Sequence, residues 1–194
     1  MKADNRSALV AEANLFDYFH PKVEVAAERQ RAPVSEGTVF YLSSLLAEQS
    51  HAEAEGDTLA ELRQAAVAAP LAESVGLWRR LGDRSLVLLG WFRESLSRRQ
   101  ISPSYCAEMG TGAYSRLRGL FSLASAEAPD VYEDLADRYD ACAAVLRDVR
   151  DDTRAEDPAA IVALYEEWLH TGSPRVAERL RALGVVPMRA RGNA

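Results

Sequence analysis

Prolines and glycines divide this chain into segments of helical length, and none of those segments alternates apolar and polar residues as a strand does. The 194 residues include 33 Ala and 23 Leu but only 15 Val, 2 Ile and 5 Thr. Alanine and leucine favour helices, whereas the β-branched residues that favour strands are scarce. The sequence therefore predicts an all-α fold, a single-domain multi-helix bundle of about nine or ten helices.

Start and stop signals give approximate bounds for these helices. We expect helices over 6–18, 22–31, 35–55, 58–69, 71–81, 84–97, 103–122, 130–149, 158–171 and 173–183. The first is expected to end before Pro21, and Gly82-Asp83 is expected to form a turn in which Asp83 caps the next helix. We expect a single all-α domain over 1–184, followed by a frayed basic tail over 185–194.

The segment 130–149 has the most regular apolar pattern. Its large side chains recur at alternating steps of three and four: Tyr132, Leu135, Tyr139, Cys142, Leu146 and Val149. Such a narrow stripe is typical of a coiled-coil seam or of a helix inside a bundle. Five of these residues are therefore interface candidates (Tyr132, Leu135, Tyr139, Leu146 and Val149), and burial in the core of one chain is the alternative.

Charge is distributed unevenly around a net value of −6. Residues 79–119 carry eight positive and three negative charges, whereas residues 120–170 carry four positive and thirteen negative charges. Opposed blocks of this kind favour contact within one subunit or between two, and solvated helix faces are the alternative. An acidic chain without a nucleic-acid motif is not expected to bind nucleic acid.

Apolar runs and cysteines bear on the compartment. The longest apolar run, over 86–92, is far shorter than the roughly 20 residues needed to span a bilayer, so no membrane span is expected. Cys106 and Cys142 lack metal-binding or redox spacing and are expected to be small buried residues. Unpaired cysteines suit a reducing compartment, and we expect a cytoplasmic protein.

A repeated Glu-x-x-His spacing suggests a metal site, with Glu48 and His51 in one copy and Glu167 and His170 in the other. Ferritin-like proteins use two such motifs to hold two metal ions and can act as oxidoreductases. Helical wheels, however, place both copies on the side opposite the apolar residues. We therefore expect solvated helix faces and no cofactor, with the di-metal site as the alternative.

Aromatic and polar residues that could line an apolar ligand pocket gather in the segment 82–117. The pocket candidates are Asp83, Trp91, Phe92, Tyr105, Glu108, Met109, Tyr114 and Arg116. Aromatic and Met side chains at helical spacing more often form core, which is the competing interpretation. The small residues Gly110, Gly112 and Ala113 are expected to let two helices approach closely.

The segment 82–117, together with Phe40-Tyr41-Leu42-Ser43-Ser44-Leu45-Leu46, resembles an uncharacterised family of all-helical bacterial proteins. The resemblance covers about residues 34 to 150 and implies a bacterial cytoplasmic helical domain, with no activity that can be transferred. From the stripe and the charge blocks we expect a non-enzymatic protein that acts through protein–protein contacts. We expect a homodimer and an additional, unidentified protein partner, and the alternative is a bundle that binds a small molecule or a metal.

Overall fold

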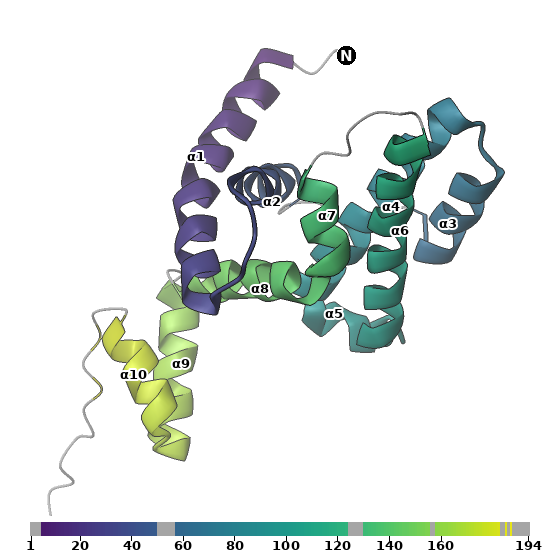
Figure 1. Cartoon of the computed structure of the whole chain (residues 1–194). Coiled ribbons are helices and arrows are strands. Elements are labelled where there is room, and N and C mark those ends of the chain that lie inside the picture. Colours follow the sequence, from purple (N-terminus) through teal and green to yellow (C-terminus); the bar gives the residue numbers. More distant parts are fainter. Residues whose placement is uncertain are drawn as a thin grey trace, which may run out of the picture. The chain divides into compact units, whose positions relative to one another are not determined.

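The computed structural model describes residues 5–49, 57–123, 130–155, 158–182, 185 and 187. These residues form ten helices and no strand, which confirms the all-α prediction (Figure 1). The helices are α1 (Asn5–Gln30), α2 (Glu36–Gln49), α3 (Leu59–Ala68), α4 (Leu71–Gly90), α5 (Arg93–Arg98), α6 (Pro103–Leu123), α7 (Asp130–Asp137), α8 (Tyr139–Ala155), α9 (Pro158–Thr171) and α10 (Pro174–Ala182). None of them is long and apolar enough to cross a membrane.

The chain divides into two compact units, residues 1–149 and residues 150–194. This division falls inside α8, so the sequence boundary expected at 184/185 lies within the second unit. Most of the expected tail, residues 186 and 188–194, lies outside the described residues. The large hydrophobic core belongs to the first unit and draws buried side chains from α1 to α8.

Helix α1 runs through Pro21, so the prediction of two short helices separated by that proline is wrong. A proline inside a helix removes the hydrogen bond to the carbonyl group four residues earlier. Here both Pro21 and Asp17 are exposed, which leaves that carbonyl group on the solvent side. The opposite side of α1 buries Phe19 and Val23 in the core, and this packing holds the helix together across the proline.

Three helices of the first unit, α2, α3 and α6, are each capped by a side chain close to the starts expected at 35, 58 and 103. The Ser35 hydroxyl accepts from the Thr38 amide at 3.2 Å, and the Ser102 hydroxyl accepts from the Tyr105 amide at 3.1 Å. Thr58 forms a reciprocal capping box with Glu61, in which each side chain accepts a hydrogen bond from the other residue's amide. Caps of this kind are local interactions, which is why the sequence alone locates them.

Helix α4 continues through Gly82 and Asp83, so the predicted turn at these residues is wrong. Gly82 is required for a different reason: a Cβ atom there would lie 2.7 Å from the Tyr114 ring of α6. The glycine therefore lets α4 and α6 pack closely, and Figure 1 shows the two helices side by side. Gly110 accommodates the Tyr139 ring in the same way, as expected for a small residue, whereas Gly112 has open space around it.

The stripe segment 130–149 forms two helices rather than one. Helix α7 ends at Asp137 and α8 begins at Tyr139, and Figure 1 shows the two helices running in different directions. The break lets the two halves of the stripe reach different partners. Tyr132 of α7 stacks on Phe121 of α6, whereas Leu146 of α8 lies against Gly90 of α4.

In the second unit, α9 and α10 pack against each other. Gly172 has a φ of 64° and ends α9, and Pro174 occupies the first position of α10, where its missing N–H costs nothing. Ala177 and Leu180 of α10 are buried. The Arg179 guanidinium donates to the Asp151 carbonyl at 2.9 Å, which ties α10 to the last turns of α8.

Candidate functional site

A buried carboxylate lies at the middle of α4, where three helices meet. Asp83 Oδ1 accepts a hydrogen bond from the Tyr41 hydroxyl of α2 at 2.5 Å and another from the Tyr114 hydroxyl of α6 at 2.8 Å. The second oxygen, Oδ2, lies 3.4 Å from Nε of Arg79, one turn earlier on α4. Asp83 therefore has a partner for each of its oxygens, as a buried carboxylate requires.

Burial controls the protonation of this cluster. Burial raises the pKa of Asp83, and the hydrogen bonds from Tyr41 and Tyr114 only partly oppose that rise. Burial, followed by the nearby Asp83 charge, raises the pKa of both tyrosines, so their hydroxyls stay protonated at neutral pH. The tyrosines can therefore donate hydrogen bonds to Asp83 but do not supply a phenolate nucleophile.

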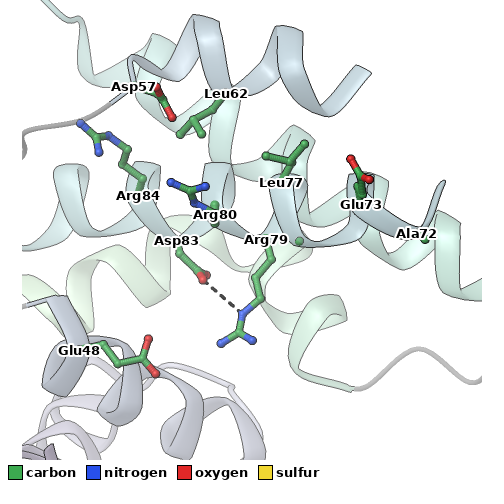
Figure 2. A pocket seen from close by; sticks show the side chains of 11 residues that line it. Glu48, Asp57, Leu62, Ala72, Glu73, Leu77, Arg79, Arg80, Asp83 and Arg84 are labelled. Atoms are coloured by element: carbon green, nitrogen blue, oxygen red, sulfur yellow. Dashed lines mark ion pairs between the residues drawn. The ribbon is translucent and has the colours of Figure 1, made fainter. Parts of the chain in front are cut away.

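Asp83 also lies at the edge of a cavity of about 800 Å³ (Figure 2). The cavity is lined by one residue of α2, one residue before α3, one residue of α3 and eight residues of α4. They are Glu48, Asp57, Leu62, Ala72, Glu73, Gly76, Leu77, Arg79, Arg80, Asp83 and Arg84. Three of these side chains are guanidinium groups from one helix. A volume of this size falls within the range of about 300–1,000 Å³ that is typical of small-molecule sites.

A second concavity, the α3/α4/α6 groove, has a volume of about 750 Å³ and shares no lining residue with the Asp83 cavity. Its walls are Arg63, Ala66, Val67, Ala69, Leu71, Ser74, Trp78, Leu81, Tyr105, Glu108, Met109, Gly112, Ala113, Arg116 and Leu120. Three large apolar side chains are exposed there: Val67 at 69%, Leu71 at 64% and Tyr105 at 38%. The groove is thus an apolar surface with charged residues among its walls.

The structure distributes the predicted pocket residues over three places. Tyr105, Glu108, Met109 and Arg116 line the α3/α4/α6 groove together. Asp83 and Tyr114 meet in the buried hydrogen-bonded cluster. The third place is the end of α4, where Trp91 and Phe92 pack against the core and the Trp91 ring meets the Phe19 ring edge-on at 5.6 Å.

The five interface candidates are all buried within one chain. Tyr132, Leu135, Tyr139, Leu146 and Val149 belong to the core of the first unit. Their side chains are covered by the other helices of the same unit, because the stripe breaks between α7 and α8 and each half packs inward. None of these five side chains therefore forms part of the exposed surface of the first unit.

Neither Glu-x-x-His copy forms a metal site among the residues that the structure describes. Glu48 is exposed on α2, and Glu167 and His170 are exposed on α9, in agreement with the outward placement expected from the helical wheels. The His170 ring nitrogen Nδ1 lies 3.0 Å from the Glu166 carbonyl oxygen. His51 lies outside the described residues. Within those ranges no three His, Cys, Asp or Glu side chains come together as metal ligands would.

Both cysteines are fully buried, as predicted. Burial raises the pKa of Cys106, and it raises the pKa of Cys142 to about 12. Both thiols are therefore protonated at neutral pH, and they contribute packing rather than reactivity.

Tyr41, Arg79, Arg80 and Arg84 were missed as site residues. The signal for Asp83 was present, because an acidic residue between Leu81 and Leu86 interrupts the buried side of a helix. Its partners on α2 and α6 are 42 and 31 residues away in the chain, and no local pattern connects them. The arginines belong to the basic block 79–119, which the charge count located without showing where its side chains converge.

Comparison of the chain with protein-family models, with curated proteins and with solved structures finds no match. No relative therefore assigns a role to the Asp83 cluster, the cavity or the groove, and their interpretation rests on the geometry described above.

Proposed function

We propose that this protein acts through protein–protein contacts and forms a homodimer through the α3/α4/α6 groove. The observation that carries the proposal is the exposure of Val67, Leu71 and Tyr105 along one concave surface. Exposed apolar residues that cluster in this way are a common mark of an interaction surface. Burying them against a second copy would remove apolar area from water, which is the main source of association free energy.

Charge favours a second copy of the chain as the occupant. The groove has Arg63 on α3 and both Glu108 and Arg116 on α6. In a two-fold dimer the same patch meets itself, so a surface that carries both charge signs beside an apolar centre can be complementary to its own copy. The groove thus supplies the exposed apolar residues that the buried stripe does not.

The proposal also includes the cellular compartment and the kind of organism. Two buried, unpaired cysteines fit a reducing compartment, so we place the protein in the cytoplasm. A bacterial source is proposed from the resemblance of residues 34–150 alone.

Analytical ultracentrifugation of the wild-type chain and of two charged variants tests the dimer. Val67→Glu places a carboxylate in the groove, whereas Val25→Glu places the same charge on α1 at a residue that is 50% exposed. We expect the wild type and V25E to sediment as dimers and V67E to sediment as a folded monomer. Its unfolding midpoint should equal that of the wild type at concentrations where the wild type is also monomeric. A wild type that stays monomeric at high micromolar concentration, or a V67E variant that dimerises as well as V25E, would refute the proposal.

A further inference from the structure

Two opposite charges of the α3/α4/α6 groove are placed symmetrically along α6. Glu108 and Arg116 lie four residues before and four residues after Gly112, and all three residues are exposed and line the groove. At about 100° per residue, both charged residues lie about 40° from Gly112 around the helix. We propose that the two-fold axis of the dimer passes beside Gly112, so that Glu108 of each copy pairs with Arg116 of the other.

This pairing rests on the proposed homodimer and adds the register in which its two copies meet. A two-fold axis that crosses a helix at right angles sets the two copies of that helix antiparallel, and their contacts are reciprocal. With the axis at Gly112, Glu108 of one copy lies opposite Arg116 of the second, since each is four residues from the axis. Tyr105 lies opposite Gly119 in the same way, because each is seven residues from the axis.

Neither charge is satisfied within one chain. In the part of the chain that the structure describes, Glu108 and Arg116 take part in no ion pair and no side-chain hydrogen bond. They do not meet each other, because side chains that meet on one helix are three or four residues apart and these are eight apart. A second copy gives each charge an opposite partner, and complementary charges of this kind fix the register of an interface.

The symmetry favours a second copy over a different protein. Equal spacing of two opposite charges about one point is what a two-fold contact requires, because each copy then offers both members of the pair. A different protein would need its own matching charges, and nothing would place them at equal distances from Gly112.

The surface of α6 beside the axis leaves room for a second helix. A Cβ atom added at Gly112 or at Gly119 would meet nothing within 4 Å. Glycine has no side chain, so it permits another backbone to come close. Tyr105 is exposed on the same face, and in this register its ring covers Gly119 of the second copy. The open space permits the approach, and the charge pairs fix its register.

Charge reversal tests the pairing by analytical ultracentrifugation of Glu108→Arg, of Arg116→Glu and of an equimolar mixture of the two. A homodimer of either variant holds two like-charged contacts, so we expect each to raise the dimer dissociation constant by about tenfold or more. A heterodimer of E108R with R116E has both opposite-charge contacts again. We therefore expect the mixture to dimerise within about threefold of the wild type, although neither variant does so alone.

Glu28→Arg is the matched control, because it makes the same charge change at an exposed position of α1, outside the groove. We expect E28R to dimerise within about twofold of the wild type, since only general screening changes. The unfolding midpoints of all variants, compared at concentrations where each is monomeric, show that the fold is intact.

Gly112→Leu tests the position of the axis without a change of charge. Its Cβ meets no atom within one chain, so G112L should fold, whereas its side chain would block a helix that crosses there. We expect the dimer dissociation constant of G112L to rise by about tenfold or more. Gly76→Leu is its control, since Gly76 of α4 is equally open but lies outside the groove, and G76L should dimerise as the wild type does.

The outcomes separate this register from the dimer itself. A monomeric wild type refutes both. A wild-type dimer that is unaffected by E108R and R116E, or that forms as well in G112L as in G76L, overturns the register and leaves the dimer standing. Weakening by E108R alone, or a mixture that stays monomeric, also overturns the register, because Glu108 would then meet another cation such as Arg63.

Discussion

Replacing Asp83 with alanine is the most direct test of the buried cluster between α2, α4 and α6. The change removes the acceptor of two tyrosine hydroxyls and the partner of Arg79, while it adds no atom to the core. The loss of stability depends on which of its three former partners, the Tyr41 hydroxyl, the Tyr114 hydroxyl and the Arg79 guanidinium, can be hydrated instead.

The three groups differ in exposure. The Tyr114 side chain is fully buried, so its hydroxyl would be left without an acceptor at a cost of about 1–3 kcal/mol. Tyr41 is only partly buried, and 49% of the Arg79 side chain is exposed, so water can hydrate both. Removing a carboxylate whose pKa is raised by burial also returns part of its desolvation cost. We therefore expect Asp83→Ala to lower the free energy of unfolding by about 1–3 kcal/mol, nearly all of it through Tyr114.

A double-mutant cycle isolates that contribution. Urea unfolding followed by far-ultraviolet circular dichroism would be measured for the wild type, Asp83→Ala, Tyr114→Phe and the double variant. Because removing both partners leaves no unsatisfied group, the double variant should cost less than the sum of the single changes by about 1.5–3 kcal/mol. Additive costs, or a loss in Asp83→Ala below about 0.5 kcal/mol, would show that the hydrogen bond does not stabilise the fold.

Two further outcomes follow from other buried residues. Leu135→Ala should lower the free energy of unfolding by about 2–5 kcal/mol without changing the sedimentation mass. Val25→Ala, at an exposed position of α1, should change it by less than about 0.5 kcal/mol. A dissociated but stable L135A would contradict the core assignment. Asp134 accepts hydrogen bonds from the Ser35 amide and the Thr38 hydroxyl, both at 2.7 Å. Burial would raise the pKa of Asp134, but these hydrogen bonds and the Arg138 charge outweigh it and lower the pKa. Asp134→Asn should therefore be less stable than the wild type at neutral pH. In urea titrations the difference in unfolding free energy should shrink as the pH falls below the ordinary aspartate pKa of about 3.9 and then through the lowered pKa of Asp134. A difference that does not depend on pH would refute the charge effect.

The helical fold and many helix ends could be predicted from the sequence because they depend on local interactions. Alanine and leucine content indicated helices, and Ser35, Thr58 and Ser102 each cap a helix through an amide three residues away. The predicted helix breaks at Pro21 and Gly82 were wrong because non-local packing, rather than a local interaction, decides the structure there. Both residues break isolated helices, and here packing against distant segments outweighs that local preference.

The sites depend on contacts that no local pattern encodes. The sequence by itself determined that Cys106 and Cys142 are buried and that a basic block covers 79–119. Only the tertiary structure decided that Asp83 meets Tyr41 and Tyr114, and that the 132–149 stripe breaks between α7 and α8 and is buried within its own unit. The physical reason is the distance along the chain over which each interaction acts. A cap or a helical spacing acts over three or four residues, whereas the partners of a buried carboxylate are chosen by the helices that pack around it.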